Sequence, residues 1–232
     1  MKIKTFKTSI FKPNENLLSF ISGYLPHIPD NSILVVTSKI VALSEGRFIA
    51  DADETTKERV IKQESDIVLK TKYVCLTIKD GMAMANAGVD ESNGNGSIIL
   101  LPKDSFKAAA KIRSYFKKKY RLNNFGVIIT DSRCLPLRAG ITGVALGYAG
   151  FRGLKKYQGA LDIFGRPFKY SRVDVADSLA TAAVLCMGEG NERQPLALIN
   201  NVSVDYVERV NKSELKIDIK EDMYGPLFRK IK

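Results

Sequence analysis

The stretch SILVVT (residues 32–37) decides how the rest of the sequence is interpreted. It is a short β-branched run that follows the turn-forming residues PDN (29–31) and ends on the polar pair Ser38 and Lys39. An apolar run of this length, bounded by turn residues, indicates a buried strand. We therefore predict a strand over 32–37 that delivers Ser38 and Lys39 at its end, where they would be candidates to contact a phosphate.

Helical spacing of apolar residues appears in three other parts of the chain. It predicts a helix over 54–69, with Glu64 near its apolar face, and another around 106–120. A third helix is predicted after Ser171-Arg-Val-Asp174, which fits a capping box, and it should end at Gly188. Its expected apolar stripe comprises Val175, Leu179, Ala182, Ala183 and Cys186. The small residues of this helix would let it lie close against another backbone.

Short extended runs predict further strands over 73–78, 97–101 and 125–130, with a Gly- and Asn-rich turn over 90–96. The 232 residues fit one large domain or two small, intimately packed ones, and no internal repeat or flexible linker is present. The sequence thus predicts an α+β fold of mixed sheets and packed helices, forming one unit over residues 1–232.

Composition is that of an ordinary globular protein, with 45% apolar and 26% charged residues. No stretch reaches the roughly 18 apolar residues of a membrane span, and the N-terminus lacks the apolar core of a signal peptide. Cys75, Cys134 and Cys186 are scattered and form no Cys-x-x-Cys pair. We expect a cytoplasmic protein with reduced thiols and no membrane partner, in which the single His27 has a surface or packing role.

The formal charge of +11 is concentrated in one segment, because residues 101–122 hold eight Lys or Arg against one Asp. Phe106, Ile112, Phe116 and Tyr120 repeat there at helical spacing, and the lysines lie on the other side. This pattern is typical of a solvated helix face. Nucleic-acid binding through the segment ranks lower because no nucleic-acid motif accompanies the charge, although a basic surface would attract anionic substrates.

Four polar clusters stand where predicted elements end. They are Ser38-Lys39, the segment 86–93, Thr130-Asp131-Ser132 and the segment 187–190. Carboxylates such as Asp90, Asp131 and Glu189, with a serine hydroxyl and substrate phosphates, are the hard oxygen ligands that magnesium or manganese prefers. Four arginines could clamp a carboxylate or phosphate: Arg133, Arg138, Arg152 and Arg166.

Plainer alternatives stay open for the two aspartates. Asp90 in its Gly- and Asn-rich turn could form only an Asx-turn, and Asp131 after a strand could cap the next element. Neither a Gly-x-x-x-x-Gly-Lys-Ser/Thr phosphate loop nor a Gly-x-Gly-x-x-Gly fingerprint is present. A nucleotide site would therefore be of another kind.

Several segments taken together resemble the coenzyme F-420:L-glutamate ligase family. They occur in the family's order over nearly the whole chain: VVTSKIVALSEGR (35–47), NAGVDESN (86–93), VIITD (127–131), DIFGR (162–166), VADSLATAA (175–183) and MGEG (187–190). Glu64-Ser65 and the closing EDMYGPLF (221–228) are also similar to family features. Several ordered motifs are far more specific than any one of them.

The resemblance implies an enzyme, dependent on GTP or ATP and on magnesium or manganese, that joins L-glutamate to an anionic acceptor through an acyl phosphate. It also implies a gamma-glutamyl ligase fold and an intertwined homodimer. By motif position, Asp90 and Asp131 would bind one metal and Ser132 and Glu189 a second. Ser38, Lys39 and Asn93 would bind the nucleotide, and Gly188 and Gly190 would allow its close approach. Asp131 and Arg138 are the catalytic candidates.

Two departures from the family pattern bear on the substrate. Leu43 stands where the family usually has Lys, and TDSRCLPLR (130–138) replaces Thr-Asp-Thr-x-Gly-Arg, so that Arg133 or Arg138 would supply the lost charge. The main hypothesis is a ligase whose acceptor is the deazaflavin precursor or a folate. The alternatives are a non-catalytic nucleotide- or metabolite-binding homologue and, ranked last, a nucleic-acid-binding protein.

Overall fold

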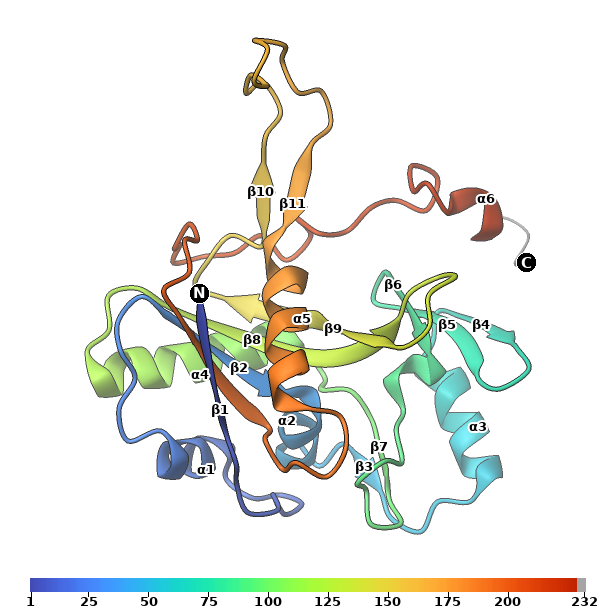
Figure 1. Ribbon diagram of the computed structural model, residues 1–232. Helices are drawn as coiled ribbons and strands as arrows, with labels where there is room; N and C mark the ends of the chain where they lie inside the picture. Colours follow the sequence, from blue (N-terminus) through green and yellow to red (C-terminus); the bar gives the residue numbers. More distant parts are fainter. Residues whose placement is uncertain (229–232) are drawn as a thin grey trace.

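A five-stranded mixed sheet forms the centre of the protein in the computed structural model, which describes residues 1–228 (Figure 1). Its strand order is β1 (Lys2–Phe6), β12 (Leu196–Asn200), β2 (Ser32–Thr37), β8 (Phe125–Cys134) and β9 (Ile141–Ala149). β2 and β8 run parallel, and the other neighbours are antiparallel. The predicted strand 32–37 is confirmed, buried at the middle of the sheet.

Helices cover both faces of this sheet. One face packs against α1 (Leu17–Tyr24), α2 (Ser38–Ser44) and α4 (Ser105–Tyr120), and the other packs against α5 (Val175–Met187). The alternation of a strand divides β2 between the two cores, since Leu34 and Val36 enter the first and Ile33 and Val35 the second. The predicted α+β fold of mixed sheets with packed helices is thus confirmed.

Smaller elements surround the central sheet. A two-stranded sheet of β3 (Phe48–Ile49) and β7 (Ile98–Ile99) leads to α3 (Glu54–Gln63) and a three-stranded sheet. That sheet consists of β4 (Ile67–Lys70), β5 (Cys75–Lys79) and β6 (Met82–Ala85), followed by the 3-10 turn Asn86–Gly88. A hairpin of β10 (Leu154–Lys156) and β11 (Arg172–Asp174) projects from the body as an arm (Figure 1). The short α6 (Gly225–Phe228) ends the described chain, in which no helix is long and apolar enough to cross a membrane.

The prediction of one helix over 54–69 is wrong in its second half. Asp53 caps α3 by accepting a hydrogen bond from the Thr56 amide, but the helix ends at Gln63. Residues 67–70 instead form β4, paired antiparallel with β5. Glu64 follows the helix, and its carboxylate accepts hydrogen bonds from Arg47 at 2.7 Å and Lys79 at 2.8 Å. The apolar spacing of this segment fits either a helix or a strand. The pairing with β5 and the contacts of Glu64 with the two cations favour the strand.

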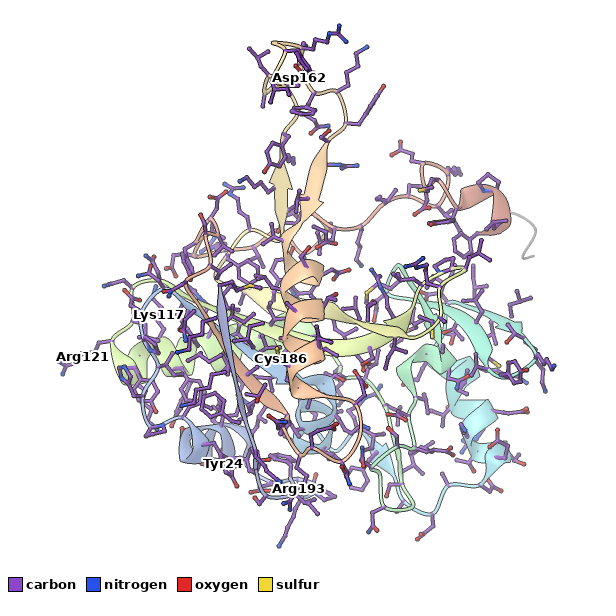
Figure 2. All side chains as sticks on the ribbon, viewed as in Figure 1. Tyr24, Lys117, Arg121, Asp162, Cys186 and Arg193 are labelled. Carbon is purple, nitrogen blue, oxygen red and sulfur yellow. The ribbon has the colours of Figure 1, made fainter. Side chains whose placement is uncertain are left out.

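The capping box predicted at Ser171 is also wrong, whereas the helix that it introduces is confirmed. Asp174 is the capping residue, accepting from the Asp177 amide at 2.9 Å, and residues 172–174 form β11. Gly188 ends the helix with a φ of +81°, a backbone conformation that favours glycine. Cys186, predicted within the apolar stripe, is exposed on the outer side of α5 (Figure 2).

α5 lies directly against strand β9, as its small residues predicted. A Cβ on Gly143 would lie 2.5 Å from the carbonyl oxygen of Ala180. The register shifts between Ile129 and Thr130, where β9 holds one extra residue, and the shift reverses which face later residues occupy. Gly147 therefore meets the start of α4 on the opposite face of the sheet, 2.5 Å from the Phe106 nitrogen.

The basic helix α4 packs its predicted apolar residues into the core, with Ile112 and Phe116 buried. Arg113 on this helix is buried as well, and its Nε donates to the Phe125 carbonyl at 2.8 Å. Glu208 accepts hydrogen bonds from both Arg113 and Lys117, which lower the pKa of its carboxyl to about 2. Part of the positive charge of this segment is therefore paired with Glu208 of the same chain.

Candidate active site

The first part of the candidate site is the loop after β6, where Asp90 faces Lys39. The Lys39 ammonium donates to Asp90 Oδ2 at 2.8 Å, to Ser92 Oγ at 3.0 Å and to the Ser92 carbonyl at 2.5 Å. Ser92 in turn donates to Asp90 from its amide at 2.8 Å and its hydroxyl at 2.6 Å. The Asx-turn alternative for Asp90 is thus present, and it coexists with an ion pair to the helix that follows β2.

The Asp90 loop is held in place by backbone pairing. Asp90 and Ile99 exchange two backbone hydrogen bonds, of 3.0 and 2.8 Å. Burial disfavours ionisation of the Asp90 carboxyl, but the hydrogen bonds from Lys39 and Ser92 outweigh it and hold the pKa below its ordinary value. Asp90 is therefore a carboxylate that a cation already accompanies.

The second part is Asp131 on β8, beside Lys39 because β2 and β8 run parallel and pair Thr37 with Thr130. The carboxyl end of a parallel strand pair is a common place for binding residues. Burial raises the pKa of Asp131 to about 7; the Ser132 amide opposes this by donating to Asp131 at 2.9 Å, and the charges of Asp90 and Glu189 raise it further. Asp131 thus lies close to two other carboxylates that raise its pKa, and the charge of Lys39 only partly offsets their effect.

The third part is the segment after α5. Glu189 accepts a hydrogen bond from the Ser132 hydroxyl, as expected if the two residues act together. The side-chain amide of Asn93 donates to the Gly190 carbonyl at 3.0 Å. Through these two contacts the 187–190 segment joins the Asp90 loop to the end of β8. Residues from four distant parts of the sequence therefore meet at one place.

Taken in pairs, these oxygen atoms could serve as ligands of a divalent cation. Within residues 1–228, no group of three or more His, Cys, Asp or Glu side chains is arranged to hold a metal ion. Magnesium is commonly bound through one or two carboxylates, with phosphates and water supplying the other ligands. The predicted pairs, Asp90 with Asp131 and Ser132 with Glu189, match that pattern. The Lys39 ammonium now neutralises the Asp90 carboxylate, whose negative charge such a cation would also neutralise.

Other predicted residues lie at varying distance from this centre. Ser38 begins α2 next to Lys39 but is only 5% exposed. Arg138 lies in the exposed turn between β8 and β9, where its amide donates to the Leu135 carbonyl at 3.3 Å. Arg152 is exposed near Asp205, and Arg166 belongs to the arm, whose far end carries Asp162 (Figure 2). The structure does not bring Arg152 or Arg166 of this chain to the carboxylates.

Arg133 and a small cleft adjoin Asp131. The cleft, of about 120 Å³, lies between β6 and the β8–β9 pair. Arg133 lines it and pairs with Asp177 of α5 at 2.8 Å. Asp177 also accepts from the Ala145 amide at 3.0 Å, which fixes the carboxylate from its other side.

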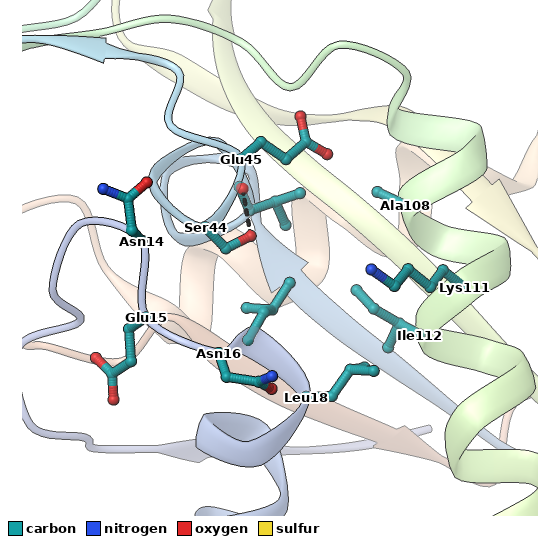
Figure 3. Close-up of a pocket in the computed structure, with 11 residues that line it drawn as sticks. Asn14, Glu15, Asn16, Leu18, Ser44, Glu45, Ala108, Lys111 and Ile112 are labelled. Carbon is teal, nitrogen blue, oxygen red and sulfur yellow. Dashed lines mark hydrogen bonds between the residues drawn. The ribbon is translucent and has the colours of Figure 1, made fainter.

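A second hollow, of about 280 Å³, lies at the other end of α2 (Figure 3). It is bounded by α1, α2 and α4, and the ammonium of Lys111 points into it across from Glu45. No residue predicted for the site lines this hollow. It is separate from the cluster of predicted site residues at the start of α2.

Two residues that complete these contacts were not among the predicted site residues. Ser92 forms part of the Asp90 cluster, and the Asp-x-Ser spacing typical of an Asx-turn was an available signal. Asp177 holds Arg133, but its place in an otherwise apolar helix gave no sign of that partner.

Comparison with known proteins identifies the family. The F420-0:gamma-glutamyl ligase family profile matches residues 5–201. A coenzyme F420:L-glutamate ligase of Methanococcus maripaludis (strain C7) is 34% identical over 97% of each chain. The proteins of the same name from Methanocaldococcus jannaschii and Methanopyrus kandleri are 34% and 30% identical, over 85% and 82% of this chain. The resemblance seen in the ordered motifs is confirmed, and this chain belongs to the F420-0:gamma-glutamyl ligase family.

Proposed function

We propose that this protein is a cytoplasmic ligase that forms an amide between L-glutamate and the carboxylate of a coenzyme F420 precursor, using GTP or ATP and magnesium or manganese. The observation that carries the proposal is that Asp90, Lys39 and Glu189 all lie close enough to Asp131 for their charges to act on it, at the ends of two parallel strands. Membership of the family supports the reaction class, and the names of the relatives support the acceptor.

The proposed chemistry explains why such a site needs both signs of charge. A carboxylate is a poor electrophile, so it first attacks the terminal phosphorus of the nucleotide. The bond from that phosphorus to the bridging oxygen breaks, and the nucleoside diphosphate leaves with the electron pair. The glutamate amine then attacks the acyl carbon, phosphate departs, and the nitrogen loses a proton. Two anions must approach each other in the first step, which costs Coulomb energy unless cations lie between them.

The residues divide this work by position. Asp90 and Asp131 would hold one divalent cation and Ser132 and Glu189 another, which would offset the charge between carboxylate and triphosphate. Lys39 and Asn93 would bind phosphate or ribose with Ser38, and Gly188 and Gly190 would allow the nucleotide to approach the backbone, where the Glu192 carboxylate now lies. Arg138 would add positive charge for the anionic substrates from the turn beyond β8.

Two features bear on which nucleotide and acceptor are used. Leu43, where the family usually has Lys, packs against the core on the α1 side of the sheet, so it gives no cation to the nucleotide. The altered 132–138 segment lies beside Asp131 and not within the Asp90 loop. Because Asp131 and the Ser132 hydroxyl are kept, the difference concerns the acceptor more than metal binding, and a folate is the acceptor to compare with the deazaflavin.

An assay of coupled turnover tests the proposal. Purified protein with Mn²⁺ and either GTP or ATP should form GDP or ADP only when L-glutamate and the acceptor are both present. Mass spectrometry should detect the glutamyl adduct of the deazaflavin precursor. An adduct of folate alone would keep the ligase and replace its acceptor. Nucleotide binding without any adduct across both acceptors would instead indicate a non-catalytic homologue.

Lys39 provides a prediction about cation binding. In the structure its ammonium is fully engaged with Asp90 and Ser92, so it competes with a metal for Asp90. Lys39→Met should therefore bind Mn²⁺ alone about 3- to 10-fold more tightly and bind nucleotide about 10-fold more weakly. Isothermal titration calorimetry measures both affinities.

Lys57→Met is the matched control for Lys39→Met, because Lys57 pairs with the neighbouring Glu91 at 2.9 Å and leaves Asp90 untouched. It removes the same charge close to the same loop. Equal changes in Mn²⁺ affinity for both variants would contradict direct competition and leave only a general effect of net charge.

We also propose that the protein acts as a homodimer in which the β10–β11 arm packs on a second copy. Apolar side chains at the arm's far end are open to solvent, with Ile163 92% and Phe164 80% exposed. Exposed apolar groups gathered on a projecting hairpin are typical of an interaction surface. The arm holds the family-like segment DIFGR, so the same surface would be shared with relatives.

Ile163→Asp combined with Phe164→Asp should convert the dimer to a monomer, because two charges would have to be buried without partners. Light scattering coupled to gel filtration gives the molar mass. Gln158→Asp, on the same arm but polar and exposed, should leave the dimer intact. A wild-type protein that is monomeric throughout the micromolar range would contradict the proposal, as would a dimer that survives both aspartates.

A further inference from the structure

The cleft beside Asp131 is lined by two kinds of residue. Met82 and Met84 of β6, with Val144 and Leu146 of β9, are apolar. Asp131, Ser132 and Arg133 of β8 are polar. A molecule lying in this cleft would contact both hydrocarbon and charged groups.

Arg133, one of the polar residues lining the cleft, is held in place by Asp177. Its guanidinium donates to Asp177 at 2.8 Å, and Asp177 is fixed by the Ala145 amide and lies in the first turn of α5. Its Nε, in contrast, is buried and has no hydrogen-bond partner within residues 1–228. The Arg133 side chain as a whole is 31% exposed, so its guanidinium still has donors that a molecule in the cleft could reach. A carboxylate matches a planar guanidinium in shape and charge.

The chemistry of the cleft distinguishes among the three substrates. L-glutamate is a zwitterion with two carboxylates and an ammonium, which an apolar wall would desolvate at a cost. A nucleotide triphosphate is far too large and polar. A volume of about 120 Å³ is also below the roughly 300–1,000 Å³ of sites that enclose a drug-sized molecule. The cleft therefore fits a short aliphatic stem ending in a carboxylate, with the rest of the molecule outside.

We propose that Arg133 selects the acceptor by binding its reacting carboxylate, whose aliphatic stem lies along Met82, Met84 and Leu146. The proposal rests on the ligase function proposed above and names the residue that gives that site its acceptor specificity. Arg133 holds one carboxylate oxygen, which leaves the other free to form the bond to the terminal phosphorus. Because Asp131 is two residues away on the same side of β8, the carboxylate is delivered next to the metal-binding pair.

Steady-state kinetics of Arg133→Met test this assignment. We expect the KM for the acceptor to rise about 10-fold or more, since a charge-assisted hydrogen bond to a buried group is lost. The KM values for nucleotide and L-glutamate should change by less than about twofold. Arg133→Lys should fall between the wild type and Arg133→Met, because it keeps the charge but loses the planar fork. Arg59→Met, an exposed position on α3, is the matched control.

A binding measurement separates this inference from the ligase reaction. Without nucleotide, the fluorescence of the deazaflavin precursor can be titrated with protein, using the free carboxylate and its carboxamide as probes. Wild-type protein should prefer the carboxylate, and Arg133→Met should bind the two about equally. Unchanged Mn²⁺ affinity and circular dichroism would show that the variant is folded.

Several results would overturn the assignment of Arg133. One is a rise in the KM for L-glutamate in place of that for the acceptor. Another is an effect of Arg138→Met on the acceptor KM with none of Arg133→Met. A wild-type protein indifferent to carboxylate or carboxamide would overturn it too. If no amide forms at all but the binding preference holds, the reaction proposal fails while the carboxylate site stands.

Discussion

Asp131→Asn is expected to lower the rate of amide formation by at least about 10²-fold while making the metal-free protein more stable. Changes to the residues that merely orient metal ligands already cost roughly 10- to 100-fold, so removal of a direct ligand should cost more. The substitution keeps the shape of the side chain and removes its charge. Both effects follow from the position of this carboxylate, which is buried beside other carboxylates at the end of β8.

The stability effect has a definite pH dependence. Burial raises the pKa of Asp131 from 3.8 to about 7, so the folded state holds its proton more tightly than the unfolded state does. The contribution to stability is therefore fully present below about pH 4 and is lost as the pH rises through 7. Asn carries no charge at any pH. The variant should exceed the wild type by about 1–3 kcal/mol at pH 8 and match it at pH 4.

Thermal unfolding in a metal chelator measures this difference. For a chain of this size, 1 kcal/mol shifts the midpoint by roughly 2–4 °C. Added Mn²⁺ should stabilise the wild type and have much less effect on Asp131→Asn. A variant that is less stable than the wild type at pH 8 would mean that burial and the charges of Asp90 and Glu189 do not disfavour the ionised Asp131 carboxylate.

Gly143→Ala is expected to destabilise the protein by about 2–3 kcal/mol and to reduce its activity about tenfold. The new methyl group would lie 2.5 Å from the Ala180 carbonyl oxygen and 2.8 Å from Val184 Cγ2. A backbone atom cannot swing aside as a side-chain end can, so α5 itself must shift. Because Glu189 follows α5 directly, the shift reaches the site, and small displacements there cost much of the rate.

Gly23→Ala is the control for this substitution. Gly23 is exposed in α1, has no atom within 4 Å of the new methyl group and has no positive φ. Alanine there should stabilise by about 0.4–1 kcal/mol, chiefly by restricting the unfolded chain. Chemical denaturation of both variants checks the pair of predictions. Equal small effects would mean that α5 and β9 are less tightly packed than the structure indicates.

Local sequence predicted those elements of the fold in which pattern and packing agree. The apolar run 32–37 fits only the interior of a sheet, and the strand predicted there is confirmed. The 106–120 repeat fits a helix packed on the face of a sheet, and that helix is confirmed too. The segment 54–69 failed because Ile67 and Val68 suit a strand equally well, and their pairing with β5 lies outside the segment. The extra residue in β9 is also invisible in sequence, since it arises from pairing with β8.

The candidate site could be predicted by residue type but not by contact. Asp90 and Asp131 follow turn and strand signals, so they could be named. That Lys39 would bind Asp90 depends on the pairing of Asp90 with Ile99 and of β7 with β3, which no local pattern specifies. Among the four arginines named as possible clamps, Arg138 was the catalytic candidate, and only the ion pair with Asp177 and the place in the cleft single out Arg133.

The fate of the acceptor's carboxylate oxygens tests the central claim, that this site activates a carboxylate by phosphoryl transfer. The acceptor is prepared with both carboxylate oxygens isotopically labelled and is turned over with unlabelled nucleotide, Mn²⁺ and L-glutamate. An acyl phosphate predicts that each amide formed releases one phosphate carrying one labelled oxygen, while the other stays in the amide carbonyl. Release of unlabelled phosphate alongside the glutamyl adduct would contradict the mechanism.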